Sequence, residues 1–249
     1  MGPRSQAQPR GRAEPVEAEM PLGRYLASTE KRVRDRAIRS LAAFVLMRAQ
    51  EGGLSMSPAE LSKLWKGLFY CFWMSDKPLV QQQLAQELSE LVLMVAGIDT
   101  RSEEAQVASL RHALAALDFY QGFWHTMQAE WLGVDKFRID KYYLLMRRFL
   151  QAGCQLLLVY RCDALLVDRY VHIMRGTDGP LSSNNVHVPD SITYHVCDAF
   201  LAELEAAVAA HAEASPAVPT MELLAPFMDL AATSTSKQVH ERVMSRVID

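Results

Sequence analysis

The chain has 249 residues, of which 50% are hydrophobic, and a formal net charge of −3 at pH 7. This length and apolar fraction allow one large core or two coupled cores. The pI near 6.2 argues against a protein that binds polyanions over its whole surface, because such domains usually have a pI above about 9. No apolar run approaches the roughly 18 residues of a membrane-spanning helix, so none is expected.

The first 19 residues are predicted to form a flexible tail, because they are rich in Pro, Arg, Gln and Glu and lack the apolar stretch of a signal peptide. The four cysteines are scattered through apolar segments without a CxxC pair. A disulfide framework is therefore not expected, and a reducing compartment fits better.

The first half of the chain reads as helices, because apolar residues recur every three or four positions. Ser57-Pro58-Ala59-Glu60 has the form of a helix start, with Ser57 as N-cap, Pro58 at the first helical position and Glu60 closing a capping box. Glycines at 52–53 and 97 provide stops, and Gly122 is a possible bend. The predicted helices are 21–27, 29–50, 58–74, 79–96 and, capped by Ser102, 103–131.

The second half continues in the same way. Asp135 is the predicted N-cap of the next helix, and Asp190 that of a later one. Residues 176–189 contain two Gly, two Pro, two Ser and two Asn, and are predicted to form an internal loop. The predicted helices are 136–162, 164–174, 191–211, 220–232 and 237–248.

These patterns predict an all-α protein, with residues 20–249 forming a single helical-repeat domain. No alternation typical of strands is visible. The segment around Trp65 and Phe72 is apolar on two sides, which favours a helix covered by neighbours on both. We therefore expect an irregular α-solenoid of HEAT- or armadillo-like antiparallel helix pairs, with a globular helical bundle as the alternative.

Two segments carry a family resemblance. They are WKGLFYCFWMSDKPLVQQQL, residues 65–84, and FYQGFWHTMQAEWLGVDKFRIDKYYLLMRRFL, residues 119–150. Both resemble the ribosomal-RNA-processing protein 1 family, nucleolar factors of large-ribosomal-subunit assembly. Weaker similarity lies in LAPFMDLAATSTSKQV, residues 224–239, and VRDRAIRSL, residues 33–41. Many members carry a long lysine-rich extension after this region, and this chain stops at Asp249.

The resemblance implies an all-α fold and a nucleolar, non-catalytic scaffold in precursors of the large (60S) ribosomal subunit, supporting pre-rRNA processing. It also implies pre-rRNA and pre-60S assembly factors as partners, including Brix-domain and WD-repeat proteins, and no small-molecule substrate. The competing hypothesis is a general helical-repeat adaptor that binds only proteins.

The residues themselves also argue against catalysis. The seven histidines are dispersed, and no nucleophile elbow or phosphate-binding loop is present. His195 and Cys197 share a helix but, two positions apart, point to different sides. Cys154 and Cys162 have no further soft ligand nearby in sequence, so no metal or cofactor is expected.

Basic residues gather on two predicted helices, where phosphate contact competes with an ordinary solvated face. Lys136 falls in the first turn of a predicted helix, where a cation opposes the helix dipole and favours an anionic partner. Lys66 and Lys77, which flank the aromatic helix, are candidates mainly through the resemblance. The full set of candidate RNA-binding residues is Arg32, Arg34, Arg36, Arg39, Lys66, Lys77, Lys136, Arg138, Lys141, Arg147 and Arg148.

The aromatic residues fall at helical spacing with leucines, which favours core packing over stacking on bases. Some are expected to remain exposed and to be buried under a protein partner, since Tyr and Trp near Arg are typical of interface hot spots. These candidates are Tyr70, Trp73, Tyr142 and Tyr143.

Overall fold

The computed structural model describes residues 25–26, 28, 30–50, 56–98, 109–183, 188–211 and 217–248, and within these ranges it is helical with no strand. The prediction of an all-α fold is confirmed. In chain order the helices are α2 (Lys31–Gln50), α3 (Pro58–Trp73), α4 (Pro78–Val95), α5 (Leu110–Trp131), α6 (Ile139–Val159), α7 (Ala164–Arg175), α8 (Asp190–Ala210), α9 (Thr220–Thr233) and α10 (Lys237–Val243).

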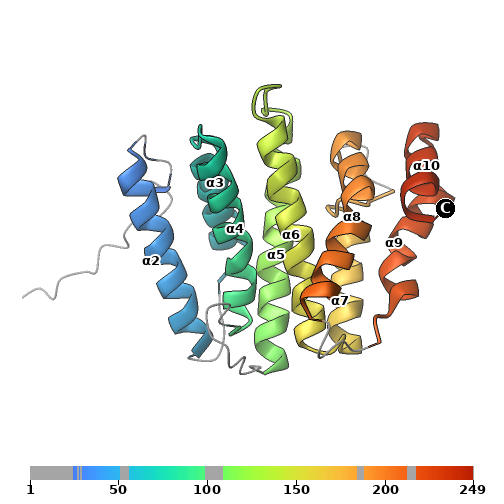
Figure 1. The fold of residues 1–249 in the computed structure, drawn as a ribbon, viewed down its shortest axis with the longest axis horizontal. Helices are drawn as coiled ribbons and strands as arrows, with labels where there is room; N and C mark the ends of the chain where they lie inside the picture. Colours follow the sequence, from blue (N-terminus) through green and yellow to red (C-terminus); the bar gives the residue numbers. More distant parts are fainter. Residues whose placement is uncertain are drawn as a thin grey trace, which may run out of the picture.

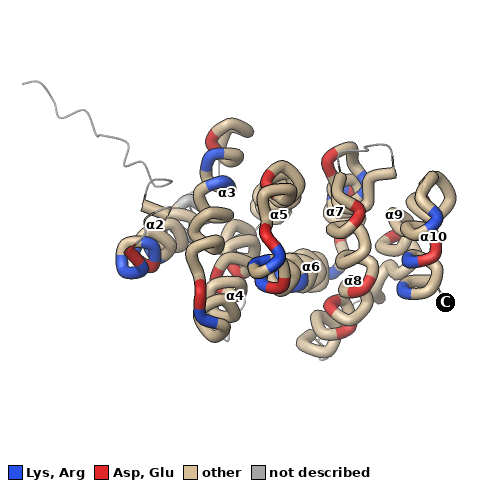
Figure 2. Tube along the Cα trace, turned by 90° about the horizontal axis from the view of Figure 1, so that it is seen from above, with Lys and Arg blue, Asp and Glu red and all other residues tan. Residues whose placement is uncertain are grey.

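The helices form two layers that run along the molecule, as Figures 1 and 2 show. In one layer α3 packs on α5, α5 on α7 and α7 on α9; in the other α2 packs on α4, α4 on α6, α6 on α8 and α8 on α10. From α3 onward, successive helices alternate between the layers. This stacking of antiparallel pairs is the solenoid-like arrangement that the sequence predicts.

The start of α3 forms as predicted. The Ser57 side chain accepts a hydrogen bond from the Glu60 backbone, and Glu60 accepts one from the Ser57 backbone at 2.8 Å. Pro58 occupies the first turn, where no intrahelical donor is needed. At the C-terminal end of the following helix, α4, Gly97 has a φ of 75° and stops the helix, as expected for glycine in this position.

Several predicted boundaries are wrong. Asp135 does not cap α6, because it caps a separate turn and Arg138 takes the N-cap position. Asp190 is the first residue of α8, and Pro189 precedes it as N-cap. The last helix changes at Met244 into a short π-helical segment, Met244–Ile248.

Some predictions lie outside the described residues. They concern the tail 1–19, most of the helix 21–27, the stop at 52–53, the cap at Ser102 and the centre of the loop 176–189.

The core is dominated by aromatic rings from α3, α5 and α6. The Trp65 indole is 2% exposed, packs against Phe119, Phe123 and Phe149, and donates to the Phe119 carbonyl at 2.9 Å. Phe123 and Phe149 stack with ring centroids 3.7 Å apart. These contacts confirm the prediction of core packing for this helix. Helix α5 runs unbroken through Gly122, whose missing side chain makes room for Trp65.

Candidate interaction surfaces

The C-terminal end of α3 is capped by a lysine from a different helix. The Lys141 ammonium, in the first turn of α6, donates to the carbonyls of Phe72, Trp73 and Ser75 at 3.0, 2.7 and 2.8 Å. The last carbonyls of a helix lack intrahelical donors and form the negative end of its dipole, so a cation is favoured there. Burial, with Arg138 nearby, lowers the pKa of Lys141 to about 8.

Arg34 of α2 also donates to a carbonyl at the C-terminal end of α3. Its guanidinium donates to the carbonyls of Met74 at 3.2 Å and Ser28 at 2.8 Å, and the residue is 8% exposed. Arg34 and Lys141 therefore fall out of the set of candidate RNA contacts, because their charged groups are directed into the protein. Sequence periodicity gives no sign of this carbonyl cluster.

The aromatic candidates for a protein interface differ in burial. Tyr142 is fully buried and donates to the Phe69 carbonyl at 3.0 Å, which removes it from the candidate interface. Tyr143 is half-buried and stacks on His195 of α8 with centroids 4.2 Å apart. Tyr70 and Trp73 are half-buried on α3. Exposed aromatic edges therefore remain at Tyr70, Trp73 and Tyr143.

The turn between α5 and α6 extends beyond the neighbouring turns at the upper edge of Figure 1. Asp135 accepts from the Phe137 backbone at 2.9 Å and forms an ion pair with Arg138, whose guanidinium lies 4.6 Å from the centre of the Trp73 ring. Lys136 is exposed in this turn and not in α6, because the helix begins three residues later. The predicted opposition between Lys136 and the dipole of α6 is therefore wrong.

Two apolar side chains at this turn are missed by sequence reasoning. Leu132 and Phe137 are 91% and 85% exposed. The sequence does contain a feature that could have identified them. An apolar residue lies on each side of the Gly-Val-Asp turn, where no buried helical face is available to cover it. Lys136 lies over the ring of Phe137, with 5.1 Å from Nζ to the centroid.

Several other candidates already have carboxylate or amide partners. Lys66 pairs with Glu130 at 2.8 Å, and Tyr70 donates to the same carboxylate at 2.8 Å. Arg147 pairs at 2.7 Å with Glu203 of α8, whose side chain is almost buried. The half-buried Arg148 donates to the Gln151 side chain at 3.2 Å. These interactions hold the side chains against their own helices or a neighbour.

Five candidate cations are exposed and form no ion pair within the described ranges, and four of them come from one edge of the molecule. The start of α2, the α3–α4 turn and the α5–α6 turn lie along one edge of the molecule (Figure 1), joined there by the Arg34–Met74 and Lys141–Ser75 hydrogen bonds. Figure 2 shows the basic positions on α2. We call these four residues the basic edge: Arg32, Arg36, Lys77 and Lys136. Arg39 is also exposed but lies at the rim of a separate groove.

The cysteine thiols do not form a reactive centre. Burial raises the pKa of Cys71, Cys154 and Cys197 to about 12, so these thiols stay protonated near neutral pH. In the described part of the chain no three His, Cys, Asp or Glu residues come together as a metal site. There, too, no helix is long and apolar enough to cross a membrane.

Comparison with known proteins gives consistent matches. The family model described as nucleolar protein Nop52 matches residues 17–249. Ribosomal RNA processing protein 1 homolog A of Mus musculus is 32% identical over 94% of this chain and 43% of its own length. Homolog B of Mus musculus is 34% identical over 93% and 29%, and the Drosophila melanogaster homolog 29% identical over 94% and 31%. The chain thus spans less than half the length of these relatives.

Proposed function

Because this chain belongs to the Nop52 family of nucleolar proteins, we propose that it is a non-catalytic scaffold in nucleolar precursors of the large (60S) ribosomal subunit. In this role it supports pre-rRNA processing by holding pre-rRNA and assembly factors in position. The names of the relatives, ribosomal RNA processing protein 1 homologs, support the link to rRNA processing. Brix-domain and WD-repeat assembly factors are the protein partners that the family resemblance suggests.

The observation that carries the RNA part of this proposal is the basic edge. Its four side chains are exposed and free of ion pairs among the described residues, so no carboxylate competes with phosphate for them. They come from α2, the α3–α4 turn and the α5–α6 turn, which hydrogen bonds from Arg34 and Lys141 hold together. Binding of this kind along an RNA backbone is compatible with the net negative charge of the chain, because only local charge is needed.

The scaffold role is supported by aromatic and apolar side chains that reach the surface. Tyr70 and Trp73 of α3 and Tyr143 of α6 present half-buried rings. Leu132 and Phe137 extend outward from the α5–α6 turn. Rigid aromatic anchors beside arginine are the composition of protein-binding hot spots.

The test reverses the four charges of the basic edge together (Arg32→Glu, Arg36→Glu, Lys77→Glu, Lys136→Glu). Binding of a large-subunit pre-rRNA transcript is measured at several salt concentrations. We expect affinity to fall at least tenfold at low salt. The slope of log affinity against log salt should shrink by about 0.7–0.9 for each phosphate that the variant no longer neutralises.

The matched control reverses four exposed cations elsewhere: Lys63→Glu, Arg111→Glu, Arg161→Glu and Lys237→Glu. It has the same net charge and should bind RNA nearly as the parent does. An equal decrease in both variants, or no decrease in either, contradicts RNA binding at the basic edge. Nucleolar localisation and co-sedimentation with large-subunit precursors that survive nuclease treatment would then favour the adaptor that binds only proteins.

A further inference from the structure

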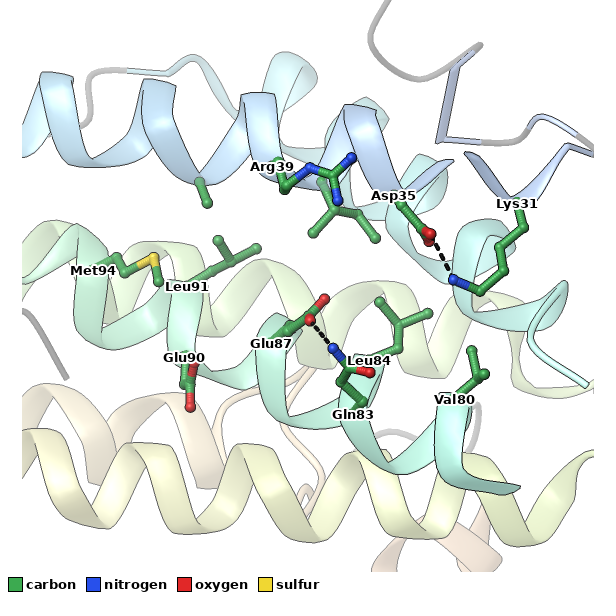
Figure 3. A pocket seen from close by; sticks show the side chains of 12 residues that line it. Lys31, Asp35, Arg39, Val80, Gln83, Leu84, Glu87, Glu90, Leu91 and Met94 are labelled. Atoms are coloured by element: carbon green, nitrogen blue, oxygen red, sulfur yellow. Dashed lines mark hydrogen bonds and ion pairs between the residues drawn. The ribbon is translucent and has the colours of Figure 1, made fainter. Parts of the chain in front are cut away.

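A groove of about 250 Å³ runs between α2 and α4 (Figure 3). Its floor is apolar and includes Ile38 from α2 and Leu84, Leu91 and Met94 from α4. From Leu84 to Met94 the floor extends along α4 for ten residues, or about 15 Å at the rise of an α-helix. The groove is therefore nearly as long as three helical turns, and at about 250 Å³ it takes a few side chains of a helix laid along α4 and not the helix itself.

The two walls of the groove carry opposite charges. On α2, Lys31 and Asp35 form an ion pair with each other, which leaves Arg39 as a cation without an ion pair in the described ranges. On α4, Glu87 accepts from Gln83 at 2.8 Å and Glu90 accepts from Gln86 at 2.9 Å. Figure 3 shows Arg39 projecting from α2 and Glu87 from α4 towards the α2 side.

These charges discriminate between classes of occupant. A nucleic acid laid in the groove would bring its phosphates against two carboxylates on α4, and like charges at such distances are unfavourable. An amphipathic helix fits both features, because it fills an apolar groove with residues at i, i+3 or i+4, and i+7 and places charged residues at its edges. The charge pattern specifies the edges: lysine or arginine beside Glu87 and Glu90, and an acid beside Arg39.

We propose that the α2–α4 groove binds an amphipathic helix of a protein partner, whose basic side faces Glu87 and Glu90 and whose acidic residue faces Arg39. This inference rests on the proposed scaffold function and names the chemistry of one of its protein partners. The site is separate from the basic edge, since only Arg39 among the candidate cations of α2 lines the groove, and Arg32 and Arg36 do not.

The test places a photo-crosslinking amino acid at Gln83 of the full chain in cells, and the cross-linked peptide is sequenced. The result expected is a peptide of another protein with apolar residues at helical spacing and at least two Lys or Arg on one side. Its yield should fall at least tenfold with Glu87→Lys and Glu90→Lys together. It should recover when the basic residues of the partner peptide are changed to Glu.

The control variant, Glu205→Lys with Glu222→Lys, changes the same net charge at exposed positions of α8 and α9 and should keep the yield. Cross-links to RNA, cross-links to another segment of this chain, or a yield that charge reversal does not change would each overturn the proposal. The groove variant should still bind pre-rRNA with its normal salt dependence. In the chain without charge reversal, absence of the cross-link while pre-rRNA binding is intact would overturn this inference alone. A cross-link to the expected peptide without pre-rRNA binding would contradict only the RNA part of the proposed function.

Discussion

At the scale of single residues, two lysines close together in sequence have different roles. Lys136 is exposed at the α5–α6 turn, whereas Lys141 is buried and donates to three carbonyls of α3 and the turn after it. A ranking of basic residues by sequence position treats the two as equals. The structure separates them, because only a group in solvent can meet an RNA phosphate without first breaking internal hydrogen bonds.

Replacing Lys141 should therefore affect stability. Lys141→Met keeps a long unbranched side chain and removes all three donors, which leaves the carbonyls of Phe72, Trp73 and Ser75 without this partner. We expect the free energy of unfolding to fall by about 3 kcal/mol. Chemical denaturation provides the measurement. Lys136→Met, in the exposed turn, is the control and should change it by less than about 0.5 kcal/mol. A stable Lys141→Met protein would mean that the remaining donors, from Ser75 to the Phe72 carbonyl and from Gln81 to the Ser75 carbonyl, are sufficient for this end of α3.

At the scale of elements, α3 and α5 approach closely enough that one of them needs a residue without a side chain. A Cβ at Gly122 would lie 2.4 Å from a ring carbon of Trp65 and 2.7 Å from its ring nitrogen. The indole cannot easily move away, since it packs against three phenylalanines and donates to Phe119. Here glycine serves the packing of two helices and does not end or bend one.

Gly122→Ala should lower the free energy of unfolding by about 1–3 kcal/mol, because overpacking outweighs the higher helix propensity of alanine. Thermal or denaturant unfolding gives the value. In a Trp65→Leu background the same change should cost much less, since the smaller side chain leaves room for the new methyl group. If the two substitutions are additive, the close approach of Trp65 is not what makes glycine necessary.

At the scale of the whole molecule, each helix in the described part of the chain makes its main contacts with the helices one or two positions away along the chain. Stability in such an arrangement is approximately the sum of local contributions. Near the C-terminal end, Phe227 of α9 is 1% exposed and its ring centroid lies 4.8 Å from that of Phe200 in α8. A defect introduced there should remain local.

Phe227→Ala should remove about 3–5 kcal/mol of packing from this end of the stack. Amide hydrogen exchange should accelerate in α8, α9 and α10, and the rates in α3 and α4 should stay near those of the parent. A uniform increase over all helices would show that the chain unfolds as one cooperative unit. The solenoid description would then hold for geometry but not for energetics.

Much of this architecture is predictable from local sequence signals, and the reasons for the remainder are physical. The capping box at Ser57 and Glu60 involves residues three positions apart, so the sequence shows it directly. The capping of α3 by Lys141 joins residues 66 or more positions apart, and no periodicity reports it. Likewise the α2–α4 groove depends on which helices become neighbours. The sequence shows that Glu87 and Glu90 are polar but not that Arg39 lies across from them.

The way α3 is completed also bears on how the chain folds as it is made. Lys141 and Tyr142 supply the donors for the end of α3 and emerge from the ribosome only after α4 and α5 have been synthesised. A nascent chain that stops before α6 keeps the local bonds from Ser75 to Phe72 and from Gln81 to Ser75 but lacks the donors of Lys141 and Tyr142. Translation must pass residue 142 before the first half of the stack reaches its final form.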